Sequence, residues 1–232
     1  MEIDLKQISV VYDRQPVIDS LSLKFTHELT YLTGLNGSGK TTLLHCLSGL
    51  IDFKGEVLIN NSSLSSISRK KRAALFAFVL QKTSIPYQIK IYDLILSGRF
   101  PHLNWLGTYQ EEDFNIVDLY LQKLEIGHLK YRRIDQVSGG ELQKAFIARA
   151  LVQDTPIILL DEPAQSLDPK NKAYIYHLLR ELADSGKTII CSTHDLDPLI
   201  YPEVRVVGLK AGKVVLDERG GELRDRLMNE VY

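Results

Sequence analysis

The 232-residue sequence has few cysteines, no long hydrophobic run and almost no net charge. Its two cysteines, Cys46 and Cys191, lie in apolar segments and are too few for a disulfide framework, so we expect reduced core residues. No run approaches the ~18 apolar residues of a membrane span, and residues 1–4 are acidic and lack the apolar stretch of a signal peptide. A formal net charge of −1 argues against nucleic-acid binding through a broad basic surface. These absences predict a cytosolic globular protein with no nucleic-acid partner.

The sequence does contain a complete phosphate-loop motif. Residues 34–41, Gly-Leu-Asn-Gly-Ser-Gly-Lys-Thr, satisfy the pattern G-x-x-x-x-G-K-[ST]. The glycines allow the backbone to wrap round phosphates with its N–H groups inward, and a helix starting near Lys40 adds the positive end of its dipole. Lys40 can reach the β- and γ-phosphates, and the Thr41 hydroxyl can ligate Mg²⁺. A plain glycine-rich turn is the alternative, but strand-like residues 29–33 and an apolar helix face at 43–47 supply the setting that the motif requires.

Acidic residues follow a second buried strand. The apolar residues 157–160 predict a strand covered on both faces, and Asp161 and Glu162 come directly after it. In an open α/β sheet, ligands bind at the carboxyl ends of the strands. We expect Asp161 to hold Mg²⁺, partly through water, and Glu162 to act as general base toward an attacking water. An isolated Asp-Glu pair is usually a solvated turn, whereas this pair follows a buried strand in a chain with a phosphate loop.

Three more residues at strand ends are candidates for the same site. Gln81 follows the apolar run 75–80, and its side-chain carbonyl could contact both Mg²⁺ and the water. His194 follows the predicted strand 188–192, where it could hydrogen-bond a γ-phosphate. Tyr12 ends the first predicted strand and could stack on a purine. Each has a structural alternative: a loop glutamine in solvent, a capping histidine and a half-buried strand tyrosine.

Between these motifs the pattern predicts an α/β core interrupted by helices. Other alternating or apolar runs predict strands at 4–11, 21–25, 55–59, 204–209 and 214–216, with a turn at 14–16. Residues 83–151 are helical in pattern, with a short helix at 92–96 and a capping box at 108–111 before a second helix. The expected core positions of that helix are Phe114, Val117, Leu121 and Leu124. We therefore predict an inserted helical subdomain, 83–151, within a nucleotide-binding core and β subdomain formed by 1–82 and 152–232.

Two further helix starts carry signals of their own. Ser138 and Glu141 have the spacing of a capping box, yet Gly139 and Gly140 inside it cost ~1 kcal/mol each against alanine. That cost indicates a close approach to the backbone, for which a phosphate is the natural candidate. Asp168 is the expected N-cap of a later helix with proline at its first position. The expected core face of this helix is Tyr174, Ile175, Leu178, Leu179 and Leu182.

Taken in order, these motifs resemble those of the ATP-binding cassette (ABC) ATPases over essentially the whole chain. Residues 34–41 are similar to the Walker A loop, and residues 157–161 are similar to Walker B, with Glu162 in the place of the catalytic glutamate. Gln81 is similar to the Q-loop glutamine and His194 to the switch histidine. Residues 138–141 are similar to the signature motif, and residues 166–168 to the D-loop. The resemblance implies an α/β phosphate-loop NTPase core with an antiparallel β subdomain and an inserted α-helical subdomain. It also implies that two copies pack head to tail around two ATP molecules with Mg²⁺.

The resemblance assigns a role to each matching residue. Nucleotide contacts would come from Tyr12, Gly34, Leu35, Asn36, Gly37, Ser38, Gly39, Lys40, Thr41 and Thr42. Catalysis would involve Glu162, His194 and Gln81, and Mg²⁺ would be held by Thr41, Gln81 and Asp161. The second copy would contribute Ser138, Gly139, Gly140, Glu141 and Asp168. We expect ATP to close the dimer and hydrolysis to let it open.

A narrower resemblance lies at residues 92–102, where the Gly-Arg-x-Pro-His cluster is similar to ATPases of iron–siderophore, haem and cobalamin importers, called type II importers. It implies permease subunits docking near 83–110, a substrate-binding protein as indirect partner, and a place at the cytoplasmic face of a membrane. A surface histidine after a helix-stopping proline is the structural alternative. Other function classes remain open: a soluble ABC ATPase without a transport role, an ATPase for another cargo, or a phosphate-loop kinase or binding module.

Overall fold

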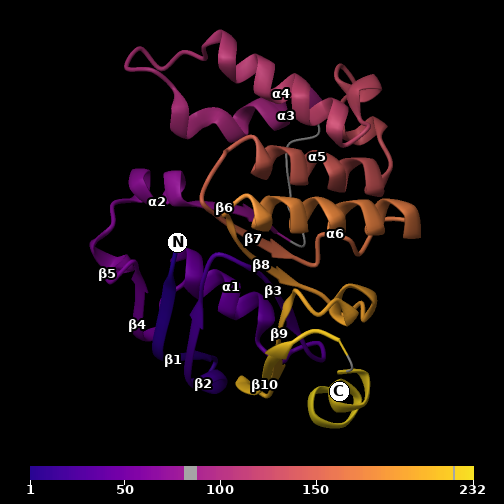
Figure 1. Cartoon of the computed structure of the whole chain (residues 1–232). Helices are drawn as coiled ribbons and strands as arrows, with labels where there is room; N and C mark the ends of the chain where they lie inside the picture. Colours follow the sequence, from indigo (N-terminus) through magenta and orange to yellow (C-terminus); the bar gives the residue numbers. More distant parts are fainter. Residues whose placement is uncertain (81–87, 222) are drawn as a thin grey trace.

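The computed structural model describes residues 1–80, 88–221 and 223–232, and arranges them as two β-sheets beneath a group of helices (Figure 1). The larger sheet has the strand order β10-β9-β3-β8-β7-β6. Its members are β3 (Leu29–Thr33), β6 (Phe76–Val79), β7 (Ile157–Asp161), β8 (Thr188–Ser192), β9 (Arg205–Lys210) and β10 (Lys213–Arg219). All neighbours pair in parallel except β9 and β10, which form an antiparallel hairpin. Strands β3, β7 and β8 are buried along their whole length, as their continuous apolar runs require.

The smaller sheet is antiparallel and has the order β2-β1-β4-β5. Its strands are β1 (Ile3–Tyr12), β2 (Gln15–Phe25), β4 (Lys54–Ile59) and β5 (Ser62–Ser63). The turn predicted at 14–16 is wrong by about a residue, because Asp13 and Arg14 take the positive φ angles of 46° and 67° while Gln15 already pairs with Tyr12. Helix α1 (Lys40–Ser48) packs between the apolar faces of the two sheets through Leu43, Leu44 and Leu47. The short η1 (Leu64–Ser66) and α2 (Arg69–Leu75) lead from this sheet to β6.

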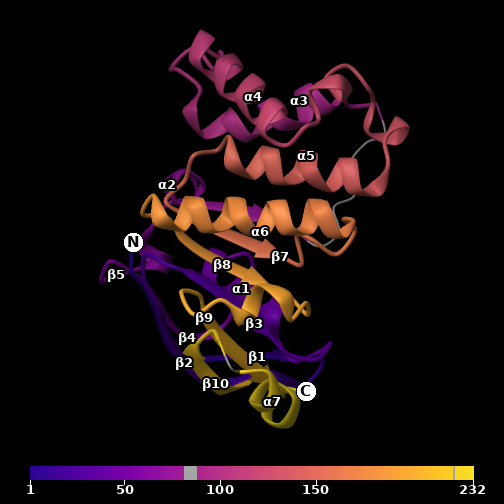
Figure 2. The same ribbon diagram turned by 45° about the vertical axis from the view of Figure 1, so that its right-hand side comes forward.

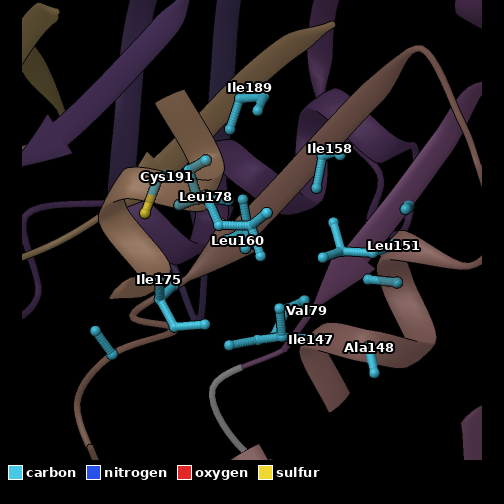
Figure 3. Close-up of a cluster of buried hydrophobic side chains, with 14 of the residues drawn as sticks. Val79, Ile147, Ala148, Leu151, Ile158, Leu160, Ile175, Leu178, Ile189 and Cys191 are labelled. Carbon is cyan, nitrogen blue, oxygen red and sulfur yellow. The ribbon is translucent and has the colours of Figure 1, made fainter. Parts of the chain in front are cut away.

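Strands β6 and β7 are neighbours in the sheet, although the chain between them contains, over its described residues 88–156, a series of helices. These helices are α3 (Ile91–Leu96), η2 (Ser97–His102), α4 (Glu111–Lys123), η3 (Gly127–Leu129), η4 (Ile134–Gln136) and α5 (Gly139–Leu151). In two views α5 lies between the α3–α4 pair and α6 (Pro169–Asp184), so that α5 and α6 cover the larger sheet (Figures 1 and 2). Figure 3 shows the resulting core, in which Ile147 and Leu151 of α5 and Leu178 of α6 meet apolar side chains of β6, β7 and β8. The predicted α/β fold with an antiparallel sheet and a helical part is confirmed.

Within the helical part a buried ion pair ties three elements together. Arg99 donates from Nε to Oδ1 of Asp113 at 2.7 Å and from a terminal nitrogen to the Val152 carbonyl at 2.8 Å. A β-carbon on Gly98 would lie 2.1 Å from the Arg149 carbonyl oxygen, so η2 packs directly on α5. Two members of the Gly-Arg-x-Pro-His cluster therefore serve the packing of this chain.

Three expectations about helices are corrected. The N-cap of α4 is Gln110, whose backbone N–H bonds Asp113, whereas Thr108 instead hydrogen-bonds Asn104 in the preceding loop. Phe114 is 39% exposed and packs against Tyr109 rather than in the core. Tyr174 is 37% exposed, and its hydroxyl bonds the Lys123 carbonyl. Phe114 and Tyr174 were placed by helical spacing alone, which does not show where a helix face leaves the core. The cap was placed by the spacing of Thr108 and Glu111, two residues before the cap that the structure has.

The chain ends in a helical turn packed on β9 and β10. Residues Arg224–Arg226 form α7 and Leu227–Val231 form η6, and Leu223 and Leu227 are buried (Figure 2 labels α7). The 3-10 segment η5 (Asp197–Ile200) follows β8. Over the described parts of the chain, no helix combines the length and apolar character needed to cross a membrane.

Candidate nucleotide site

The phosphate-loop motif forms a tight turn between β3 and α1. The φ angles of Gly34, Gly37 and Gly39 are 147°, 82° and 104°, values that residues with a side chain rarely adopt. At Gly34 a β-carbon would also lie 2.2 Å from the Leu209 carbonyl oxygen, so the loop starts in contact with β9. Gly39 is the residue before α1, so the loop leads directly into the N-terminus of this helix, where the helix dipole favours an anion. This geometry suits a phosphate group.

Lys40 lies folded over the loop. Its side chain is buried, and Nζ donates to the carbonyl oxygens of Gly34 at 2.7 Å and Leu35 at 3.2 Å. Burial lowers the pKa of the Lys40 ammonium from its ordinary value, and the nearby Glu162 and Asp161 carboxylates oppose that change. The ammonium group is thus held above the same backbone that would meet the phosphates.

Asp161 is the centre of the acidic side of the site. Its Oδ2 accepts a hydrogen bond from the Thr41 hydroxyl at 2.7 Å, and its Oδ1 accepts one from the Ser192 hydroxyl at 2.6 Å. Hydroxyl and carboxylate oxygens are the ligands that Mg²⁺ prefers, so this pair suits the expected metal. Ser192 also accepts a bond from the Glu162 N–H at 2.9 Å and so joins both acidic residues. Sequence reasoning missed Ser192; its position as the last residue of a buried strand was the available signal.

Glu162 and His194 lie together at the edge of the sheet. Oε2 of Glu162 is 3.5 Å from Nδ1 of His194. Glu162 has a φ of 48°, an uncommon conformation for a residue with a side chain, and is buried at 8% exposure. The side chain of His194 is 46% exposed. A buried carboxylate beside an exposed imidazole is an arrangement that can accept and pass on a proton.

Two adjoining cavities run along these residues. One, of about 350 Å³, is lined by Lys40, Thr41 and Thr42 of the loop and α1 and by Val17 of β2. The other, of about 280 Å³, is lined by Gly34, Leu35, His194 and Tyr232. Three residues line both cavities: Asn36, Glu162 and Gln165. Val17, Gln165 and Tyr232 were not expected here from the sequence.

Not every expected site residue lies at these cavities. The residues that line them do not include Tyr12, which is 47% exposed at the end of β1. Ser138, the N-cap of α5, is exposed and holds Glu141 through its N–H and hydroxyl, both at 2.8 Å from Oε2. Asp168 caps α6 by accepting from the Asn171 N–H at 3.0 Å. Gln81 lies outside the residues that the structure describes.

Comparison with known proteins identifies the family. A family model described as ABC transporter matches residues 18–165. The chain is 32% identical to the petrobactin import ATP-binding protein YclP of Bacillus subtilis, over 99% of this chain and 92% of that protein. It is 31% identical to the phosphonates import ATP-binding protein PhnC 3 of Halalkalibacterium halodurans, over 99% and 93% of the two chains. The fold matches a dimeric post-hydrolysis structure of the ATP-binding cassette MJ0796 bound to ADP and Pi, with a TM-score of 0.85, 28% identity and coverage of 94% and 98%. This chain therefore belongs to the ABC transporter family, as one of its ATPases.

Proposed function

We propose that this chain is the ATP-hydrolysing subunit of a membrane importer, in which two copies close head to tail around ATP and open after hydrolysis. The observation that carries the proposal is the separation of the two halves of the site. Residues of the phosphate loop, Glu162 and His194 line the cavities, and Asp161 accepts a hydrogen bond from Thr41 beside them, whereas Ser138 faces solvent at the start of another helix. A second copy could supply that helix start, and the similarity to a dimeric cassette bound to ADP and Pi supports this arrangement.

Within one copy each residue has a role in binding or proton transfer. The loop amides and Lys40 would bind the phosphates. Thr41 and Asp161, with Gln81 from the undescribed segment, would hold Mg²⁺, which when bound neutralises charge on the phosphate oxygens. Glu162 would take the proton of the attacking water. His194, 3.5 Å from Glu162, would orient that carboxylate. It would also hydrogen-bond the γ-phosphate.

The second copy would contribute the start of its helix α5. At Gly139 a β-carbon would meet nothing within 4 Å, whereas at Gly140 it would lie 3.1 Å from the Ser166 carbonyl oxygen. Gly140 thus allows α5 to pack on the loop before Asp168, and Gly139 leaves the outer surface open. The Ser138 hydroxyl, the N–H groups of residues 139–141 and Asp168 would then meet the nucleotide or loop of the other copy.

The membrane subunits would dock on the helical part near residues 83–110. The described portion of this segment exposes three large apolar side chains: Phe100 at 61%, Trp105 at 91% and Leu106 at 63%. Asn104 fixes the loop that carries the last two, because its Oδ1 accepts from the N–H groups of Leu106 and Thr108, both at 3.0 Å. A fixed, exposed apolar loop favours a protein partner. The chain would then lie at the cytoplasmic face of the membrane, with a substrate-binding protein as indirect partner.

We propose that the cargo is an iron–siderophore or a similar metal-related compound. The proposal is based on the similarity to the petrobactin import protein and on the resemblance at residues 92–102. The phosphonate relative keeps another cargo as the alternative. The cluster at 98–102 is weak evidence for either cargo, because Gly98 and Arg99 serve packing within this chain. Uptake assays with membranes containing the assembled transporter, using siderophore, haem, cobalamin, manganese and phosphonate in turn, would identify the cargo.

Two measurements test the proposed function. Ser138→Arg should abolish ATP turnover while the monomer still binds nucleotide, because the bulky cation blocks the contact with the other copy. Normal turnover in this variant would contradict a site shared between copies. Co-purification of the chain with a polytopic membrane protein is expected for a transporter subunit; its absence from membranes would favour a soluble ABC ATPase instead.

A further inference from the structure

The C-terminal turn, defined here as residues 224–232, is fixed to the sheet by several independent contacts. Leu227 and Val231 are buried, at 2% and 0% exposure. Arg226 forms ion pairs with Glu230, at 2.9 Å, and with Glu218 of β10. These contacts anchor the turn on the hairpin β9–β10, which lies next to β3 in the sheet.

A glycine in β9 makes room for this turn. A β-carbon at Gly208 would lie 2.4 Å from Cγ2 of Val231 and 3.1 Å from Cβ of Leu216. Gly208 is also the residue that pairs with Thr33 in the β3–β9 register. The missing side chain therefore brings Val231, and with it the next residue, close to the carboxyl end of β3.

Tyr232 reaches the residue before the phosphate loop. Its hydroxyl shares a hydrogen bond of 2.6 Å with Oγ1 of Thr33, which is fully buried. Thr33 is followed directly by Gly34, whose carbonyl oxygen accepts from Nζ of Lys40. Since Gly34 has no space for a side chain against Leu209, the start of the loop lies directly against β9, and the residue before it is hydrogen-bonded to Tyr232.

The same tyrosine forms part of the wall of the site. It lines the cavity of about 280 Å³ together with Glu162 and His194. It does not line the neighbouring cavity, where Lys40, Thr41 and Thr42 lie. Tyr232 therefore lies beside His194 and the start of the phosphate loop, and not in the cavity where Lys40 and Thr41 lie.

We propose that Tyr232 is a positioning residue for ATP hydrolysis: it fixes the Thr33–Gly34 start of the phosphate loop and closes the chamber beside Glu162 and His194. This inference rests on the proposed function, since it assumes that hydrolysis takes place in this chamber. The C-terminal turn would then affect hydrolysis through one group, the Tyr232 hydroxyl bonded to Thr33. Loss of that hydroxyl should reduce the rate of hydrolysis and spare the binding of ATP.

The test uses the full chain with Tyr232→Phe, which keeps the ring and removes the hydroxyl. We expect kcat to fall about three- to tenfold, the range set by one lost hydrogen bond, with the Kd of a fluorescent ATP analogue changed less than about twofold. Amide hydrogen exchange of residues 29–36 should become faster, and this readout needs no turnover. Thr33→Val should have the same effects and should not add to Tyr232→Phe.

Further variants separate positioning from a general loss of stability. Gly208→Ala should displace the turn and reproduce the Tyr232→Phe kinetics, and Val231→Ala added to it should restore them by removing the clashing methyl groups. Tyr174→Phe is the control, because it also deletes a hydrogen-bonded hydroxyl, but one that bonds the Lys123 carbonyl and belongs to a residue that lines neither cavity. Unchanged kcat and unchanged exchange in Tyr232→Phe would overturn the inference. A wild-type chain that neither binds nor hydrolyses ATP would instead overturn the proposed function.

Discussion

Ser192 donates a hydrogen bond to Asp161 across 2.6 Å, with both side chains buried at the carboxyl edge of the sheet. The same hydroxyl accepts from the backbone N–H of Glu162. One serine thus fixes both the expected Mg²⁺ ligand and the expected general base. It does so from the strand whose continuation carries His194, so that three parts of the site are held in register by β7 and β8.

Ser192→Ala should leave Asp161 Oδ1 and the Glu162 N–H without their buried partner. We expect a loss of about 1–3 kcal/mol in the free energy of unfolding and a fall in kcat, since the two carboxylates lose their alignment. Thr155→Val is the matched control, because it deletes a buried hydroxyl bonded to the Ile157 carbonyl at the opposite end of β7. Equal kcat values in the two variants, measured on folded protein, would argue against the positioning role of Ser192.

Gly34→Ala should abolish ATP binding, because the new methyl group would meet the Leu209 carbonyl oxygen at 2.2 Å. Gly37→Ala provides the comparison: its backbone is also at positive φ, but nothing lies within 4 Å of the added carbon. There we expect only the conformational cost of about 1–2 kcal/mol and weakened binding. Titration with a fluorescent ATP analogue measures both; similar affinities in the two variants would contradict the close contact with β9.

Asp113→Asn should destabilise the chain by about 3–5 kcal/mol at neutral pH, because it leaves Arg99 charged and buried. Burial raises the pKa of Asp113, but the Gln110 N–H and the Arg99 guanidinium outweigh it, so the pKa lies below its ordinary value. A lowered folded-state pKa contributes stability above the unfolded pKa of about 3.9, and that contribution is lost as the pH falls further. The difference between wild type and variant in denaturant unfolding should therefore shrink below about pH 4.

The control for this pair is Asp118→Asn, whose carboxylate bonds Lys130 at 2.6 Å while 45% exposed. We expect a change below about 1 kcal/mol, since exposed ion pairs are screened by solvent. If Asp113→Asn costs no more than the control at neutral pH, the ion pair of Arg99 is not a main support of the helical part.

Trp105→Ser should weaken co-purification with the membrane subunits and leave ATP binding unchanged, because the side chain is 91% exposed on a loop away from the cavities. Tyr131→Ser serves as the control. Tyr131 is also in the helical part and is 75% exposed, but it lies outside residues 83–110. Pull-down from membranes with an affinity tag gives the readout. Equal recovery of the permease with both variants would place its docking surface elsewhere.

Much of the fold and of the expected site follows from local sequence signals. The phosphate loop, the buried strands ending at Asp161 and Ser192, and the cap at Ser138 are all short-range patterns, and the structure has them where predicted. The domain boundaries at 82/83 and 151/152 stay predictions, as do the roles of the site residues. The cargo is not encoded in these patterns, because other subunits would contact it.

What the sequence could not reveal depends on contacts between distant segments. Tyr232 meets Thr33 across 199 positions, and Ser192 meets Asp161 across 31, neither of which any motif indicates. Tyr12 was expected at the site from its place at a strand end and from the family resemblance, but it lines neither cavity, whereas Val17 of the next strand lines one of them. The stacking of Tyr12 on a purine stays a prediction. Phe114 kept the helical spacing of a core residue but lies where α4 passes out of the core.

The most direct test of a site divided between two copies is the mass of Glu162→Gln in solution with and without ATP. Without its general base the variant should bind ATP, hydrolyse it about 10²–10⁴-fold more slowly and accumulate as a closed dimer. Light scattering should then show the mass doubling on addition of ATP, and Ser138→Arg in the same chain should prevent the doubling. A variant that stays monomeric while saturated with ATP, or that hydrolyses ATP at the wild-type rate, would contradict the account.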